Sequence, residues 1–176
     1  ASDALILPGV GAFIQAMNNL EKLDLIDAIK SKVRAGTPLF GICLGLQLLF
    51  SKSEEFGSGS GLKLIPGVIK KFPHKINNKK IKVPHISWNQ VYKLKNLWAD
   101  TPLHSLKNYD FMYFIHSYYV KPQSDDCILT NTNYDGVKFC SSVLQNNIFA
   151  TQFHPEKSGD KGILIYKNWA LKNKLI

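Results

Sequence analysis

Short apolar runs alternate with a helical pattern in the first third of the chain. Residues 4–7 (ALIL) form a continuous apolar run closed by a proline and a glycine, which predicts a strand buried on both faces. Apolar residues then recur every three or four positions across residues 20–33, which predicts a helix. Residues 38–42 predict a second buried strand, and residues 44–52 a second helix. This β-α-β-α order predicts an α/β fold with a parallel sheet and helices packed on its faces.

The pattern changes to short strands and turns from residue 62 onward. The predicted strands cover 62–72, 80–85, 111–120, 127–131, 137–144 and 148–153. Residues 133–136 (NYDG) are typical of a hairpin turn, because Asp-Gly accepts positive φ angles, and Asn146-Asn147 is a second candidate. Apolar positions in 163–170 predict a closing helix. Since no repeat or linker is visible, we expect a single domain over residues 1–176 with a strand-rich second half.

Composition fits an ordinary globular domain. With 176 residues and 45% apolar side chains, the chain can bury a core without disulfides or metals to stabilise it. The three cysteines at positions 43, 127 and 140 include no CxxC pair, so we expect neither a disulfide framework nor a zinc site, and no metal or other cofactor. No apolar run reaches 18 residues and no export signal is visible, so we expect a cytoplasmic protein without membrane contact.

The net charge of +9 raises the question of a polyanionic partner. Only Arg34 among the 22 basic residues is an arginine, although arginine makes the commonest specific base contact. The densest basic stretch, residues 70–82, also contains a proline and two asparagines, which is typical of a solvated loop or a lysine-guarded edge strand. We therefore expect no nucleic-acid partner.

The segment Gly41-Ile42-Cys43-Leu44-Gly45 lies where a predicted buried strand turns into a helix. Glycines two residues either side of a potential nucleophile are the pattern of a nucleophile elbow, here with cysteine in place of serine. The start of the following helix favours a thiolate, which is the reactive form. Taken alone, the pattern is equally consistent with a buried cysteine in a glycine-rich turn.

The last predicted strand ends in Phe153-His154-Pro155-Glu156. Because residues i and i+2 of a strand share a face, we expect His154 and Glu156 to point the same way. Cys43, His154 and Glu156 could then serve as nucleophile, base and orienting group. Residues 8–11 (PGVG) follow the first strand and could present backbone N–H groups to an oxyanion. Surface or structural roles are the simpler interpretation of His74, His85, His104 and His116, which lack metal-ligand spacing.

Six stretches together resemble the class I (triad) glutamine amidotransferases, and among them the glutaminase subunits of imidazole glycerol phosphate synthase. They are LPGVGAF at 7–13, GICLGLQLLF at 41–50, GLKLIPG at 61–67, PHISWN at 84–89, YFIHSY at 113–118 and QFHPEKSG at 152–159. The elbow and QFHPEKS are typical of the superfamily, and LPGVGAF, PHxxWN and the HSY strand favour the histidine-pathway branch. The resemblance implies a flavodoxin-like α/β fold with a mostly parallel central sheet, to which antiparallel strands are added.

The resemblance also implies a role for each matching residue. Cys43 would form a glutamyl thioester, His154 would be the general base and acid, and Glu156 would orient it. The oxyanion would be met by Val10, Gly11 and Leu44, and the substrate L-glutamine by Gln47, Glu55, Ser117 and Tyr118. The partner would be a (β/α)₈-barrel cyclase forming a heterodimer and receiving the ammonia, with an interface at Pro84, His85, Trp88 and Asn89.

The chain departs from the family pattern in two places. Ser87 stands where the family usually has glycine. Family members also begin with a further strand and helix ahead of LPGVG, so we expect this chain to be a fragment or the product of a shortened reading frame.

Three other functions stay open on sequence grounds. One is a paralogous glutaminase that supplies ammonia for the amidation of a surface-glycan sugar. The others are a catalytically silent binding subunit and a cysteine peptidase or hydrolase built on the same elbow.

Overall fold

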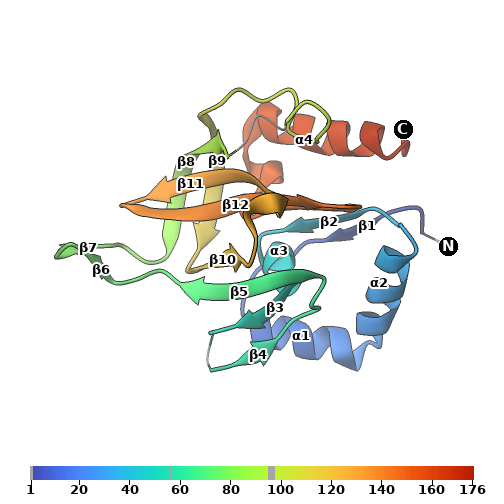
Figure 1. Ribbon diagram of the computed structural model, residues 1–176, viewed down its shortest axis with the longest axis horizontal. Helices are drawn as coiled ribbons and strands as arrows, with labels where there is room; N and C mark the ends of the chain where they lie inside the picture. Colours follow the sequence, from blue (N-terminus) through green and yellow to red (C-terminus); the bar gives the residue numbers. More distant parts are fainter. Residues whose placement is uncertain (1, 56, 95–97) are drawn as a thin grey trace.

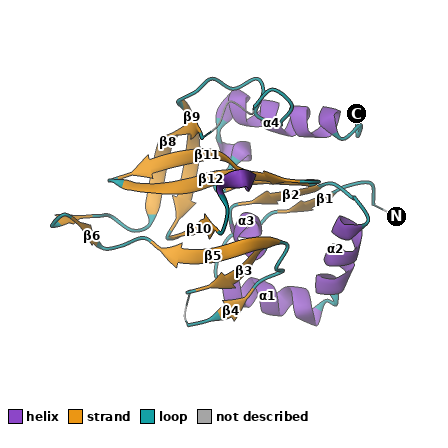
Figure 2. Cartoon of the chain, viewed as in Figure 1, coloured by secondary structure: helices purple, strands orange, loops and turns teal. Residues whose placement is uncertain are grey.

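A computed structural model describes residues 2–55, 57–94 and 98–176 of the chain (Figures 1 and 2). The first half contains β1 (Leu5–Leu7), α1 (Phe13–Lys22), α2 (Leu25–Arg34), β2 (Leu39–Ile42), α3 (Leu44–Leu48), β3 (Phe50–Ser53), β4 (Gly59–Ser60), β5 (Ile65–Lys71), β6 (Lys75–Ile76) and β7 (Lys79–Lys80). The second half contains β8 (His85–Lys93), β9 (Asp110–His116), β10 (Tyr118–Pro122), η1 (Asp125–Cys127), β11 (Ile128–Tyr134), β12 (Val137–Gln145), β13 (Ile148–Thr151), η2 (Pro155–Lys157) and α4 (Gly159–Lys172).

A mixed sheet organises the fold, with strand order β1-β2-β13-β12-β10-β5-β3-β4. The ladders β1–β2, β2–β13 and β3–β5 are parallel, and the strands of the second half pair mainly antiparallel. A branch leads from β12 through β11 and β8 to β9. The α/β fold class predicted from the sequence is confirmed, and so is the strand-rich second half.

Alternating side chains of β2 reach two separate cores on the two faces of the sheet. Leu39 packs with α1 and α2 residues such as Phe13 and Val33, whereas Phe40 packs with Trp169 of α4. Figure 1 shows the same division, with α4 on one side of the sheet and α1 and α2 on the other. The alternation follows from the two-residue period of a strand, and it fixes β2 between two layers of helices.

Two helix predictions for the first half are corrected by the structure. The helix predicted across residues 20–33 is two helices, because Asp24 adopts a left-handed conformation (φ 54°) and separates α1 from α2. The predicted helix 44–52 is shorter: α3 stops at Leu48 and Phe50 starts β3. Every side chain from residue 41 to residue 50 is buried, and an apolar run without a polar face does not distinguish helix from strand.

The first strand is not buried on both faces. Leu5 and Leu7 pack against the core on the α1–α3 side, while the side chain of Ile6 is 52% exposed. Among the described residues β1 pairs only with β2.

Two strand predictions in the second half are also corrected. Residues 111–120 are divided at Ser117 into β9, which pairs with β8, and β10, which pairs with β5. Residues 80–85 are not one strand: β7 ends at Lys80 and the nine-residue β8 begins at His85. The basic stretch forms the small β6–β7 hairpin, which projects from the body in Figure 1. Both predicted hairpin turns are confirmed, since Asp135 (φ 49°), Gly136 (φ 91°) and Asn146 (φ 54°) all take positive φ angles.

Candidate active site

Cys43 lies at a sharp bend between β2 and α3. Its backbone angles, φ 54° and ψ −106°, fall in a region that non-glycine residues rarely occupy. The bend requires Gly45, because a Cβ atom built there would lie 1.7 Å from the Leu7 carbonyl oxygen. Gly41 is also crowded, since a Cβ there would lie 3.1 Å from side-chain atoms of Ala150 and Leu49. The local geometry is that of a nucleophile elbow.

The thiol of Cys43 is held in a protonated resting state. Its Sγ donates to the Ile115 carbonyl oxygen at 3.9 Å and accepts from Gln152 Nε2 at 3.6 Å. Burial raises the pKa of this thiol to about 11, opposed by the hydrogen bond from Gln152. The free thiol therefore needs a base before it can act as a nucleophile.

His154 follows β13, the neighbour of β2, so the sheet brings it to the elbow. The Cys43 N–H donates to the Thr151 carbonyl at 2.7 Å, and the His154 N–H donates to the Tyr113 carbonyl at 2.9 Å. Its ring Nδ1 lies 2.6 Å from Glu156 Oε1. Because a carboxylate only accepts, Nδ1 carries the hydrogen and Nε2 keeps a lone pair. That Nε2 is buried and has no hydrogen-bond partner among the residues that the structure describes, which leaves its lone pair free to accept a proton.

The contact between His154 and Glu156 does not arise from strand geometry as the sequence pattern suggested. β13 ends at Thr151, and Pro155 opens the 3₁₀ helix η2, which contains Glu156. The tight turn brings the carboxylate back to the imidazole. Ser158 closes the turn by donating its hydroxyl to the His154 carbonyl at 2.6 Å.

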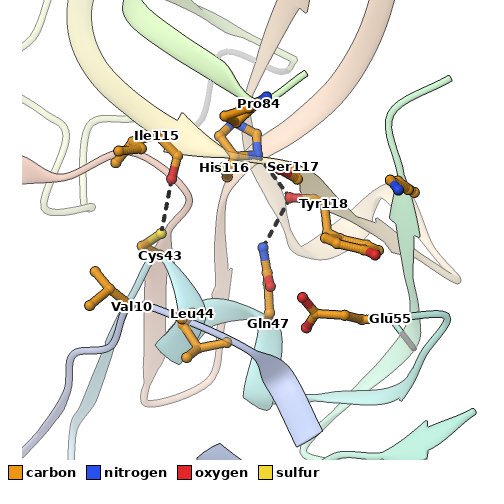
Figure 3. Close-up of a pocket in the computed structure, with 12 residues that line it drawn as sticks. Val10, Cys43, Leu44, Gln47, Glu55, Pro84, Ile115, His116, Ser117 and Tyr118 are labelled. Atoms are coloured by element: carbon orange, nitrogen blue, oxygen red, sulfur yellow. Dashed lines mark hydrogen bonds between the residues drawn. The ribbon is translucent and has the colours of Figure 1, made fainter. Parts of the chain in front are cut away.

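A cavity of about 450 Å³ opens beside the thiol (Figure 3). It is lined by Val10, Gly11, Cys43, Leu44, Gln47, Glu55, Lys71, Pro84, Ile115, His116, Ser117 and Tyr118. Gln47 Nε2 donates to the Tyr118 carbonyl at 3.0 Å and to Gln152 Oε1 at 3.1 Å. Glu55 Oε2 accepts from the Phe13 N–H at 2.6 Å. The cavity thus places one carboxylate and one ammonium, Lys71, around a volume sufficient for a small amino acid.

The family is decided by comparison with known proteins. A family model described as glutamine amidotransferase class-I matches residues 1–172. The chain belongs to this family. A relative from Aquifex aeolicus, "Imidazole glycerol phosphate synthase subunit HisH", is 46% identical over 171 residues, which cover 97% of this chain and 78% of the relative. The protein of the same name from Chlorobium chlorochromatii is 45% identical over 168 residues, 94% of this chain and 79% of that protein.

Solved structures agree on the fold of this glutamine amidotransferase. The structure of PurLQS from Thermotoga maritima superposes with a TM-score of 0.67 at 16% identity, covering 99% of this chain and 80% of that one. At this identity the likeness establishes the fold only.

The backbone groups expected to meet an oxyanion are not all free in this glutamine amidotransferase. The Leu44 N–H donates to the Gly9 carbonyl at 3.3 Å. Val10 is 75% exposed and Gly11 takes a φ of 100°, which an L side chain rarely adopts. The loop therefore presents a carbonyl, and not an N–H, to the start of α3.

The predicted interface residues divide into exposed and buried positions on and beside β8. Pro84 and Trp88 are exposed and Asn89 is half-buried, so these three are accessible to a partner. His85 is fully buried within this chain, with 0% of its surface exposed, so a role at the interface would be indirect and stays a prediction. Strand alternation explains the difference, because His85 and Trp88 point to opposite faces of β8.

Four residues of the site were not singled out from the sequence. Gln152 contacts the Cys43 sulfur, Ile115 accepts from it through its carbonyl, and His116 and Lys71 line the cavity. Gln152 and His116 lie inside quoted motifs, QFHPEKSG and YFIHSY, and that position was the available signal.

The described residues contain neither a candidate metal site nor a helix that could cross a membrane. No group of three or more histidine, cysteine, aspartate or glutamate side chains in that part of the chain could hold a metal ion. No helix within the same ranges is long and apolar enough to cross a membrane.

Proposed function

We propose that this glutamine amidotransferase is the glutaminase subunit of an imidazole glycerol phosphate synthase. It hydrolyses L-glutamine to glutamate and ammonia, and the ammonia passes to a (β/α)₈-barrel cyclase subunit that makes imidazole glycerol phosphate. The names of relatives 45–46% identical to this chain support the assignment. The observation that carries the chemistry is the buried imidazole of His154, whose Nε2 has no hydrogen-bond partner among the described residues. It follows β13, the strand that pairs with the one leading to Cys43.

The first half of the reaction uses Cys43, His154 and Glu156. His154 Nε2 takes the proton of the Cys43 thiol, and the sulfur attacks the carboxamide carbon of glutamine. The resulting imidazolium is stabilised by Glu156 on Nδ1. It returns the proton to the nitrogen, the C–N bond breaks, ammonia leaves, and a glutamyl thioester remains.

The second half reverses the proton movement. Water attacks the thioester carbon while His154 Nε2 accepts its proton, and the C–S bond then breaks. The sulfur recovers a proton from the imidazolium, and glutamate is released. Gln47, Glu55, Ser117 and Tyr118 line the cavity that would hold the substrate through both halves.

The oxyanion of each tetrahedral intermediate needs preorganised N–H donors. Leu44 would supply one such donor, and the peptide groups at Val10 and Gly11 another. In the present geometry the Gly9 carbonyl occupies the Leu44 N–H. Activity should therefore be low until that loop reorients, and docking of the cyclase would be the trigger. We place the complex in the cytoplasm.

Two experiments test the proposed function. Glutamine hydrolysis is measured for the chain alone and with the cyclase and its ligand, and the rate should rise with the complex; equal rates would exclude the trigger. In a histidine auxotroph supplied with the cognate cyclase, the gene should restore growth. Failure to complement, with glutaminase activity intact, would instead favour the paralogue that amidates a glycan sugar.

A further inference from the structure

A chain of hydrogen bonds connects the middle of β8 with the substrate cavity. His85 and His116 are register partners on β8 and β9, and His85 Nδ1 lies 3.1 Å from His116 Nε2. His116 Nδ1 lies 2.8 Å from the Tyr118 carbonyl oxygen. At the other end, Asn89 Nδ2 lies 3.4 Å from His85 Nε2 and donates to the Asn133 carbonyl at 2.9 Å.

The acceptor at the end of this series of hydrogen bonds determines which group donates and which accepts at each step. A carbonyl oxygen only accepts, so His116 Nδ1 must carry a hydrogen toward Tyr118. A neutral His116 then has a bare Nε2, which accepts from His85 Nδ1–H. The Nε2 of His85 is bare in turn, and it accepts from the Asn89 amide. Both imidazoles are therefore neutral with the hydrogen on Nδ1.

The surroundings of the pair keep both rings neutral. His85 stacks between Tyr134, at a centroid distance of 3.9 Å, and Phe114, at 5.0 Å. Phe72 lies 5.2 Å from the His116 ring. Burial lowers the pKa of His85 to about 4 and that of His116 to about 3.

The Tyr118 carbonyl links this series of hydrogen bonds to the active site. It accepts from His116 Nδ1 and also from Gln47 Nε2 at 3.0 Å, on the helix that starts at the nucleophile (Figure 3). Ser117, between β9 and β10, is the corner that these two bonds secure, and it lines the cavity with Tyr118. Two donors on one carbonyl hold the corner at a set distance from α3.

We propose that the His85–His116 pair is a positioning device: a one-directional hydrogen-bond chain, from Asn89 to Tyr118, that holds the 116–118 corner for glutamine binding. The inference rests on the proposed function for its link to glutamine. Neither histidine offers a free ring nitrogen to the Cys43 thiol, because both ring nitrogens of each are hydrogen-bonded. The hydrogen bonds of this series affect the affinity for glutamine. The series starts at Asn89, next to the exposed Trp88.

The tautomers can be read without turnover. Nitrogen-15 spectra of the ring nitrogens at neutral pH should show hydrogen on Nδ1 and a bare Nε2 for both His85 and His116. Hydrogen on Nε2 of either ring would overturn the proposal. Since this readout needs no activity, it fails or succeeds separately from the glutaminase assignment.

Matched variants test the positioning role in the complex with the cyclase. Asparagine places its amide nitrogen near the position of Nδ1 and glutamine near that of Nε2, so His116→Asn keeps the donor to Tyr118 and His116→Gln loses it. His116→Gln should raise KM for glutamine about tenfold, the loss of about one hydrogen bond. Its kcat should change less than about threefold, and His116→Asn should stay within about threefold of wild type on both constants.

A control and a contrary outcome complete the test. His74→Asn alters an exposed histidine outside the site and should leave both constants unchanged. Equal KM values for His116→Asn and His116→Gln, or a fall in kcat with KM unchanged, would contradict a positioning role.

Discussion

Two buried imidazoles of this glutamine amidotransferase, His154 and His116, have opposite bonding. His154 has Glu156 on one ring nitrogen and no partner on the other, whereas His116 has both ring nitrogens occupied. A buried nitrogen without a partner is costly in a structural role and useful in a base. A fully bonded imidazole can hold a backbone corner but has no free ring nitrogen to offer to a thiol proton. Bonding, more than burial, separates the catalytic candidate from the positioning one.

The largest effect should come from removing the unpaired base or its nucleophile. His154→Ala and Cys43→Ala should each reduce glutamine hydrolysis by the complex by about 10⁴-fold, since nucleophile and base act as one unit. Steady-state ammonia release measures the loss, and Cys127→Ala, at a cysteine outside the cavity, is the control. If a variant of His154 kept a tenth of the wild-type activity, the distinction between a catalytic His154 and a positioning His116 would be contradicted.

The paired imidazoles should be visible in the pH dependence of stability. Both have pKa values lowered on folding, so the unfolded chain binds more protons as the pH falls below about 6.5. Stability is therefore fully present above that pH and is lost below it. Between pH 7 and pH 5 each histidine should remove about 2 kcal/mol from the free energy of unfolding.

Denaturant unfolding at the two pH values measures this loss. The double variant His85→Asn, His116→Asn lacks both titrating rings, so it should lose about 4 kcal/mol less than wild type over the same range. If the free energy of unfolding fell by the same amount in the two proteins between pH 7 and pH 5, the pair would already be protonated in the folded state.

A smaller effect is expected at Glu156, the carboxylate that is hydrogen-bonded to His154. Glu156→Gln removes the charge that stabilises the imidazolium while keeping an acceptor near Nδ1, so kcat should fall by about 10²-fold. Glu54→Gln, at an exposed carboxylate that pairs with Lys70 and does not line the cavity, is the matched control. Unchanged activity in Glu156→Gln would mean that the carboxylate only anchors the turn at η2.

Local chemistry made much of the fold and site predictable. Residue types that accept positive φ angles indicated both hairpin turns, and the spacing of Gly41 and Gly45 indicated the elbow. Each of these features depends on a few adjacent residues. The break at Asp24 was missed because the apolar spacing of a helix continues across it. The short α3 was missed because a buried apolar run carries no periodic signal.

Contacts between distant segments were beyond the sequence pattern. His85 and His116 are 31 positions apart, and only the register of β8 on β9 makes them neighbours. The bond from Gln152 to the Cys43 sulfur spans 109 positions and depends on the β2–β13 pairing. Such pairs become visible once the strand order is known.

The most direct measurement of the central claim is covalent labelling with a glutamine-mimicking diazo ketone in the presence of the cyclase, followed by peptide mass mapping. The label should sit on Cys43, should be prevented by excess glutamine, and should be lost in His154→Ala. An intact, folded protein without label, or with label on Cys127 or Cys140, would contradict a glutaminase centred on Cys43 and His154.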